Sequence, residues 1–370
     1  MLRLTRRLAC LAVGCGTLTA IPAAAATPVA PAGLTVATFA TAPSGIAGPD
    51  DIAPLGKGVV VGWQNGIGPK GEPSPTGATQ SDVVLYSKAG TVMDDWKVTG
   101  HLDGIGTKGA TIYATVNEDG NTSLYTIAAH RSGAQPVQYT FSPEPDSGHS
   151  GGVLTGGGTD GVQVLHDGRL LISASAPNNG SEETVPNATA TFLATLNRHT
   201  LVAALAPTFE NDAQATDALT GETVTLGAPG SSPHALTDPD SNAIVPAKSP
   251  LYAGDYMLNS EGDGVLVFAP ITKTGLGALT ELPLSREGSP AQTGDVAWAT
   301  AKKGILYVVD KKANTIYSVT GKFPDGQAYT GLAQVGSTEN NTEVDVLNLT
   351  TGEVSPFITG FGGVKGLLFA

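Results

Sequence analysis

Cysteine is almost absent from this 370-residue chain, and the two that occur, Cys10 and Cys15, lie near its start. If that segment is removed, as argued below, the remaining chain has no disulfide, no thiolate metal site and no cysteine nucleophile. Basic residues are also scarce: Lys and Arg total 20 against 33 Asp and Glu, a formal net charge of -13. Such a chain is not expected to bind nucleic acid, whose phosphates require a basic surface. It would attract cations, although the charge could also serve only to keep the protein soluble.

Long apolar runs are missing except for Leu8–Ile21, which is too short to span a membrane. Three arginines precede this run, namely Arg3, Arg6 and Arg7. Small residues follow it, so we expect residues 1–26 to be a signal peptide that directs the protein to the periplasm, the cell surface or the medium. Ordinary secretion fits better than a twin-arginine signal, and we expect no lipid anchor at Cys15. Removal of the three arginines changes the formal charge from -13 to -16.

Helix-period apolar patterns are nearly absent from the rest of the chain. Short runs of β-branched and aromatic residues alternate with turns, in a chain that contains 48 glycines and 25 prolines. This pattern is typical of an all-β protein. We expect a disordered tether at residues 27–32 and a single domain at residues 33–370.

One short motif recurs six times, 53 to 74 residues apart, each time ahead of an apolar run. Gly158–Val162, for example, precedes Leu170–Ser173. The central residues of the six motifs are Asp50, Asp103, Asp160, His234, Asp295 and Lys365. Each unit offers about four strands, which predicts a β-propeller of six blades, each of four antiparallel strands, closed by pairing of the N- and C-terminal strands. In this scheme Ile305–Val308 is the second strand of the fifth blade, and residues 238–248 are an inserted loop.

The repeat pattern resembles the six-bladed propellers of the gluconolactonase, paraoxonase and NHL-repeat kind. In the lactonase branch, acidic residues and asparagines at the starts of the inner strands bind a divalent cation in the central channel. The resemblance therefore implies a metal site at the matching positions, which are Asp50, Asp103, Asp160, His234 and Asp295.

Several aspartates in one narrow channel repel each other, so some must be protonated, paired or bound to metal. A site of oxygen ligands suits Ca²⁺ best, whereas a His234 ligand would favour zinc, manganese or iron. The alternative is that these aspartates are ordinary turn residues that bond their own backbone. Polar turns that should reach the same face supply the remaining predicted ligand-binding residues, which are Asn65, Asn117, Asn178 and Asn259, together with Lys365.

Two classes of function fit these patterns. The first is a monomeric binding protein whose channel face takes a small molecule, a glycan or an extracellular protein. The second is a metal-dependent hydrolase of lactones or esters, with His234 or His101 transferring protons. Residues 148–152 match the Gly-x-Ser-x-Gly pattern of serine hydrolases, but neither the preceding strand nor the following helix is expected there, so we interpret them as a loop.

Overall fold

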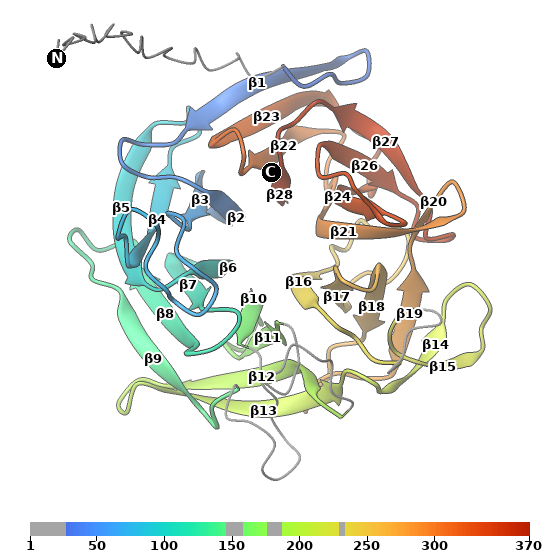
Figure 1. Cartoon of the computed structure of the whole chain (residues 1–370), viewed down its shortest axis with the longest axis horizontal. Helices are drawn as coiled ribbons and strands as arrows, with labels where there is room; N and C mark the ends of the chain where they lie inside the picture. The colour runs from blue at the N-terminus through green and yellow to red at the C-terminus, as the bar shows by residue number, and fades with distance from the viewer. Residues whose placement is uncertain (1–26, 146–157, 176–186, 229–233) are drawn as a thin grey trace, which may run out of the picture.

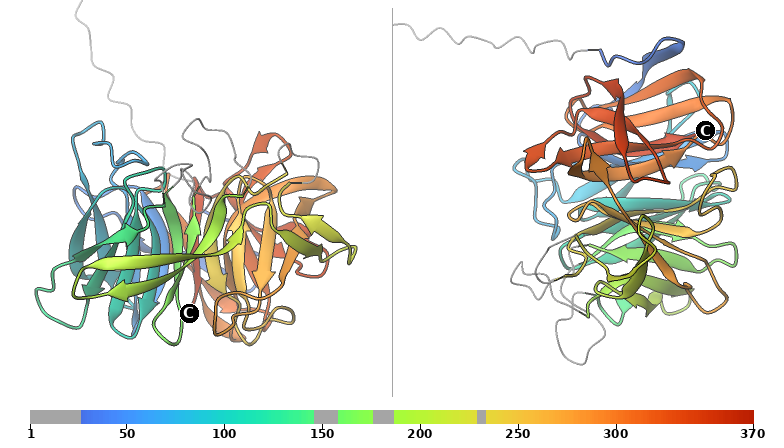
Figure 2. Two further views of the ribbon diagram at one scale, coloured as in Figure 1. Left: turned by 90° about the horizontal axis from the view of Figure 1, so that it is seen from below. Right: turned by 90° about the vertical axis from the view of Figure 1, so that its right-hand side faces the viewer.

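The strands are arranged as a ring around a central channel (Figure 1), and all regular elements of the described residues are β-strands. The structure is a computed structural model that describes residues 27–145, 158–175, 187–228 and 234–370. The predicted signal peptide, Asn178 and residues 148–152 lie outside these ranges. Seen from the side, the ring is a short, wide disc (Figure 2). The chain is thus an all-β propeller. Within the described part, nothing helical is long and apolar enough to cross a membrane.

Three consecutive stretches each form four antiparallel strands, from the channel outward. The first comprises β2 (Pro49–Leu55), β3 (Gly58–Trp63), β4 (Gln80–Tyr86) and β5 (Val92–Thr99). The second comprises β6 (Leu102–Lys108), β7 (Thr111–Val116), β8 (Ser123–Ala128) and β9 (Val137–Ser142). The third comprises β10 (Thr159–Val164), β11 (Leu170–Ala174), β12 (Thr189–Asn197) and β13 (Val202–Glu210). A parallel pairing of β13 with β9 joins the last two runs into one sheet.

The next two sheets carry additional short strands. One comprises β16 (Pro239–Ile244), β17 (Tyr256–Ser260), β18 (Val265–Ala269), β19 (Leu279–Pro283), β14 (Gln214–Asp217) and β15 (Thr223–Thr225). The other comprises β21 (Ser289–Trp298), β24 (Ala328–Val335), β26 (Glu343–Leu347) and β27 (Val354–Thr359), with β20 (Ser285–Arg286) and β25 (Thr338–Glu339) at its margins.

The two ends of the chain meet in the remaining sheet. From the channel outward it comprises β28 (Val364–Phe369), β22 (Lys303–Asp310), β23 (Thr315–Lys322) and β1 (Leu34–Thr41). Its innermost strand is therefore C-terminal and its outermost strand is N-terminal. This corrects the predicted closure: the two terminal strands share a sheet, but they pair with β22 and β23 and not with each other. This arrangement leaves no gap in the ring.

The connection between β21 and β24 corrects the predicted fifth unit. Ile305–Val308 belongs to β22, which pairs with β23 and β28, whereas β21 pairs with β24. The chain leaves the β21 sheet, contributes the β22–β23 hairpin to its neighbour, and returns to complete the first sheet. Local strand and turn signals mark this hairpin correctly, but they do not specify which sheet receives it.

The six innermost strands share one irregularity, a β-bulge near the channel mouth. In β2, Pro49 pairs with Trp63 and Ile52 with Val61, so Asp50 and Asp51 lie opposite the single residue Gly62. The same two-against-one bulge occurs in the other innermost strands of the described residues, at the start of β6, β10, β16 and β28 and in the middle of β21. A bulge redirects side chains and is common beside binding sites.

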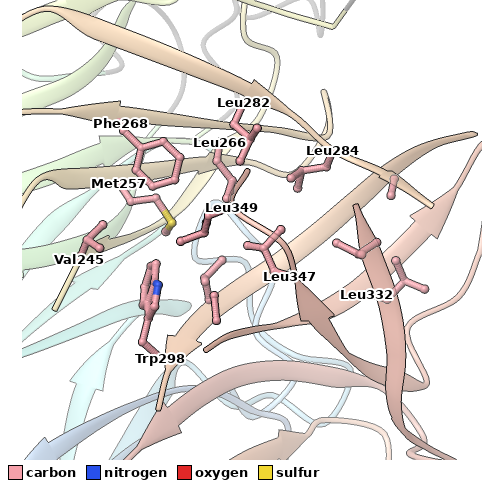
Figure 3. Close-up of a cluster of buried hydrophobic side chains, with 14 residues drawn as sticks. Val245, Met257, Leu266, Phe268, Leu282, Leu284, Trp298, Leu332, Leu347 and Leu349 are labelled. Atoms are coloured by element: carbon pink, nitrogen blue, oxygen red, sulfur yellow. The ribbon is translucent and has the colours of Figure 1, made fainter. Parts of the chain in front are cut away.

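The hydrophobic core lies between adjacent sheets. Figure 3 shows one such cluster, in which Met257 and Phe268 of the β16 sheet pack toward Trp298 and Leu347 of the β21 sheet. Equivalent clusters fill the other inter-sheet spaces. The core thus holds the channel-lining strands in place.

One residue of the segment expected to be a tether pairs with β27. Val29 exchanges two backbone hydrogen bonds with Thr359, at N···O distances of 2.7 and 3.1 Å. This contact adds to the closure by β1.

Candidate functional site

The central channel is lined by an excess of carboxylates. Its volume is about 550 Å³. The acidic residues that line it are Asp50, Asp51, Asp103, Glu118, Asp160, Asp238, Asp240, Glu261 and Asp295. The basic residues that line it are His101, Lys311 and Lys365. The channel therefore has a strongly negative wall that faces space large enough for a small organic molecule.

The first residue of each bulge forms a ring around the channel. From strand to strand the ring consists of Asp50, Asp103, Asp160, Asp240, Gly294 and Lys365. Four of these positions agree with the motif alignment from the sequence.

Two positions in the alignment are corrected. His234 is exposed and is not among the channel-lining residues; the ring position is taken by Asp240, within the segment expected to be an insertion. Asp295 lines the channel, but as the second residue of its bulge, beside Gly294. A repeat with varied loop lengths allows such shifts, because the pairing register, rather than sequence spacing, defines the position.

The second residue of each bulge connects neighbouring inner strands. Asp51 Oδ2 accepts a hydrogen bond from Ile105 N at 2.5 Å, and Asp295 Oδ2 accepts one from Leu367 N at 3.0 Å. Burial raises the pKa of Asp295 to about 6, although the bond from Leu367 opposes the rise. At Gly104 the strands are so close that a Cβ atom would lie 2.5 Å from the carbonyl oxygen of Asp160. These contacts fix the spacing of the ring.

Three residues on one side of the channel form a group that could hold a metal ion. One potential ligand atom from each of His101, Asp103 and Glu118 lies within 4.8 Å of the other two. His101 Nε2 is 3.1 Å from Asp103 Oδ1 and 3.6 Å from Glu118 Oε1. Asp103 is only 3% exposed, yet its Oδ2 has no hydrogen-bond partner among the described residues. An imidazole nitrogen and two carboxylates are a suitable donor set for a divalent ion.

The orientation of His101 supports a role as a metal ligand. Its Nδ1 lies 2.5 Å from the carbonyl oxygen of Ile67, so the proton is on Nδ1 and the nitrogen donates to that oxygen. In the neutral ring, Nε2 then presents a lone pair toward two carboxylates. That arrangement is repulsive unless a proton or a cation lies between them. Histidines that bind metals are commonly oriented by such a bond to a backbone carbonyl.

A polar network links this group to the opposite side of the channel. Lys311 Nζ donates to Asp50 Oδ1 at 3.0 Å and to Gln64 Oε1. Gln64 Nε2 donates to the carbonyl oxygen of Leu102 at 2.9 Å and lies 3.5 Å from Asp103 Oδ1. Burial alone would raise the pKa of Asp50, but Lys311 and Lys365 hold it below its ordinary value.

The other carboxyl groups in the channel have raised pKa values. Burial raises the pKa of Asp160 well above its ordinary value, and the charge of Asp240 and a hydrogen bond with it add to the rise. Burial likewise raises the pKa of Glu118 to about 9, with Asp103 adding to it. The pKa of Glu261 rises to about 7 through burial, although Lys365, with its Nζ 4.0 Å from Glu261 Oε2, opposes the rise. A bound cation would stabilise the ionised forms of these carboxyl groups and so lower their pKa values.

The asparagines predicted to bind ligand lie outside the channel lining. Asn65 Nδ2 donates to the carbonyl oxygen of Gln80, and Asn117 Oδ1 accepts from His101 N. Asn259 Nδ2 donates to the carbonyl oxygen of Gly294 at 2.7 Å. Asn178 lies outside the described residues. Lys365, by contrast, occupies its ring position and lines the channel.

Residues next to these asparagines reach the channel instead. Gln64 precedes Asn65, Glu118 follows Asn117, and Glu261 is two residues beyond Asn259. Asn65 and Asn117 have φ angles of 57° and 67°, which turn the chain while their amides bond backbone. The turns were correctly located, but their left-handed residues do not carry the channel-facing side chain. Asp51, Asp238, Asp240 and Lys311 were missed as well; the Pro-Asp pairs at 49–50 and 239–240 were the available signal for Asp240.

Comparison with known proteins identifies no relative by sequence: no family model and no curated protein matches the chain. Solved structures with a similar fold include a gluconolactonase from Xanthomonas campestris, with 12% identity over 95% of this chain and 92% of that one, at a TM-score of 0.47. They also include a streptogramin B lyase, with 12% identity, coverage of 88% and 73%, and a TM-score of 0.42. A third is a protein of unknown function from Bacteroides thetaiotaomicron, with 11% identity, coverage of 90% and 69%, and a TM-score of 0.47. At such identities and TM-scores these likenesses concern the fold alone and indicate neither a family nor an activity for this chain.

Proposed function

We propose that this chain is an exported, monomeric propeller of six blades that binds a divalent metal ion through His101, Asp103 and Glu118. The channel beside the ion then receives a small-molecule ligand. The observation that supports the proposal most directly is His101 Nε2, which faces two carboxylates while Nδ1 is bonded to the Ile67 carbonyl. Because Gln64 is bonded to Lys311, its amide nitrogen is directed at Asp103, which helps to hold that carboxylate in place.

The donor set narrows the choice of metal. The sequence favoured Ca²⁺, which prefers oxygen ligands throughout. A site with one imidazole nitrogen instead favours Zn²⁺ or Mn²⁺. When bound, such an ion would polarise a ligand carbonyl or acidify a water molecule.

Metal titration of chelator-treated protein tests this function. We expect about one equivalent of Zn²⁺ or Mn²⁺ by calorimetry, with Ca²⁺ binding more weakly. His101→Gln and Glu118→Gln should each weaken binding at least about 10-fold, since each removes one of three protein ligands. Asp325→Asn, which alters a surface carboxylate 3.3 Å from Lys248, is the matched control and should change nothing. Binding that is undetectable, or equal in all variants, would refute the proposed site.

A metal-dependent hydrolase of lactones or esters is the second candidate. Asp160 favours it, because burial and the neighbouring Asp240 raise the pKa of this channel-lining carboxyl well above its ordinary value, a shift that suits a general acid. A panel of lactones and aryl esters, assayed with and without chelator, distinguishes the two functions. Turnover that chelator abolishes and Asp160→Asn reduces would establish the enzyme; no turnover across the panel favours the binding protein.

A further inference from the structure

Three carboxylates occupy the same structural position on three successive inner strands. Asp103, Asp160 and Asp240 are each the first residue of the bulge, on β6, β10 and β16 respectively. The strands are in close contact: a Cβ at Gly104 would lie 2.5 Å from the carbonyl oxygen of Asp160, and Asn242 Nδ2 donates to the carbonyl oxygen of Gly161 at 2.8 Å. The three carboxylates therefore lie side by side on one wall of the channel, here called the carboxylate wall.

Unlike Asp50, the fourth ring aspartate, these three aspartates have no ammonium partner among the described residues, although the Asp160 and Asp240 carboxyl groups are hydrogen-bonded to each other. Asp50 is paired with the ammonium group of Lys311 at 3.0 Å. Among the described residues, no Lys or Arg nitrogen lies within 4.0 Å of a carboxylate oxygen of Asp103, Asp160 or Asp240. Asp103 is 3% exposed and its Oδ2 accepts no hydrogen bond from a described residue, an arrangement that is costly for a buried carboxylate.

We propose that the carboxylate wall binds the primary ammonium group of a small-molecule amine. An ammonium group has three N–H donors and no acceptor, which matches three carboxylates arranged side by side. Charge-assisted hydrogen bonds of this kind are stronger than neutral ones. The inference rests on the proposed use of the channel as a ligand site, but it does not require the metal ion.

The rest of the channel suits the hydrocarbon part of such a ligand. Ile244, Leu368 and Phe369 line the channel near the opposite ends of β16 and β28 from the ring. The volume of about 550 Å³ is within the range of pockets that enclose small organic ligands. The expected ligand is therefore an amine with a compact apolar body.

The ring itself favours an ammonium group over a second metal ion at the wall. Asp50 and Lys311 show that the protein satisfies an equivalent carboxylate with an ammonium nitrogen. Lys365, at another ring position, likewise directs its ammonium group toward Glu261. A second divalent ion at Asp160 and Asp240 is the competing occupant, and the experiment includes it.

Calorimetry with hexylamine, hexan-1-ol and hexanoate on metal-loaded protein tests the proposal. Hexylamine should bind at least about 10-fold more tightly than hexan-1-ol, since it alone forms charge-assisted bonds, and hexanoate should not bind. Asp160→Asn and Asp240→Asn should each weaken hexylamine binding at least about 10-fold, whereas Asp325→Asn should leave it unchanged. Either variant alone is sufficient if the other does not fold.

Three results would overturn the inference: equal binding of the amine and the alcohol, amine affinity that is insensitive to both substitutions, or a second metal equivalent that Asp160→Asn removes while the amine fails to bind. His101→Gln separates this proposal from the metal site. It should abolish metal binding and retain hexylamine binding, so failure of one proposal is distinguishable from failure of the other.

Discussion

The two sides of the channel differ in both topology and charge. On one side, β6 and β10 each begin a sheet formed by one continuous stretch of chain, and they contribute Asp103 and Asp160. On the other side, β21 and β28 belong to sheets assembled from interleaved segments, and both channel lysines come from this region, Lys365 within β28 and Lys311 directly after β22. Figure 1 shows these two sides facing each other across the ring.

The two sides therefore differ in whether a lysine neutralises the ring carboxylate. Asp50, which is next to the interleaved side, is neutralised by Lys311. Asp160 has another acid, Asp240, as its neighbour. The interleaved side thus closes the ring and neutralises part of it, whereas the continuous side leaves carboxylates available for a cation.

Removal of the closing strand should have the largest effect. Deletion of residues 363–370 eliminates β28, including the buried Val364 and Leu367, and leaves β22 with an open edge. Each buried side chain contributes about 1.5–3 kcal/mol, and the whole strand approaches the total stability of a typical domain. We expect no cooperative thermal transition and aggregation of the truncated chain. Deletion of the exposed Thr27 is the control at the other terminus. A truncated protein that melts like the full chain would show that closure by β28 is dispensable.

Substitution of the buried Asp310, on the interleaved side, should cause the second largest loss of stability. Asp310 is 1% exposed and accepts hydrogen bonds from the backbone N–H groups of Ala313, Gly362 and Gly363, at 3.0, 2.7 and 2.9 Å. Asp310→Ala leaves these donors without an acceptor, at a cost of about 3 kcal/mol or more. Denaturant unfolding measures the loss. A loss below about 1 kcal/mol would mean that water replaces the carboxylate.

Asparagine substitutions at two equivalent ring positions should have opposite effects on the metal-free protein. The pKa of Asp160 is raised above its ordinary value of 3.8, so its contribution to stability is present below about pH 4 and is lost as the pH rises. Asp160→Asn should therefore stabilise at pH 7, on the order of 1–2 kcal/mol, because it replaces a carboxyl that folding must either protonate or bury as a charge beside Asp240.

Asp50→Asn should act in the other direction. The pKa of Asp50 is held below its ordinary value, so its contribution is present above about pH 4 and is lost as the pH falls through the folded-state pKa. The variant should be destabilised at pH 7, on the order of 1 kcal/mol, and should match the parent near pH 3. Chemical denaturation of both variants from pH 3 to pH 8 tests the pair. Changes of the same sign at pH 7 would contradict the assignment of paired and unpaired carboxylates.

Much of the fold was predictable because strand and turn signals are local. The repeated motif located five of the six innermost strands, and the position of the last motif correctly brought both chain ends into one sheet, although β1 and β28 do not pair with each other. The exchange of the β22–β23 hairpin was not predictable, because Ile305–Val308 has the same alternation in either sheet. The choice depends on long-range packing, as in the contacts of Leu306 and Val308 with the core that contains Leu367.

The site was predictable only where sequence position and pairing register coincide. Asp50, Asp103 and Asp160 satisfy this condition. His234 does not, because its motif lies six residues before the true bulge residue, Asp240. The metal group also depends on Glu118, in a turn after the second strand, and its proximity to His101 follows from the left-handed turn at Asn117.

The smallest effect is expected from a substitution at the histidine that the motif placed in the ring. His234 is exposed and is not among the channel-lining residues, whereas His101 lies 3.1 Å from Asp103 Oδ1 with its other nitrogen on the Ile67 carbonyl. His234→Gln should therefore leave the metal stoichiometry unchanged and alter the affinity less than about 2-fold, within the usual range of a surface substitution. His101→Gln, the same chemical change on the channel wall, should abolish tight binding. Parallel titrations of both variants with Zn²⁺ compare the two positions directly. A loss of affinity in His234→Gln equal to that in His101→Gln would contradict the assignment of the metal site to His101, Asp103 and Glu118, because His234 is not among the residues that line the channel.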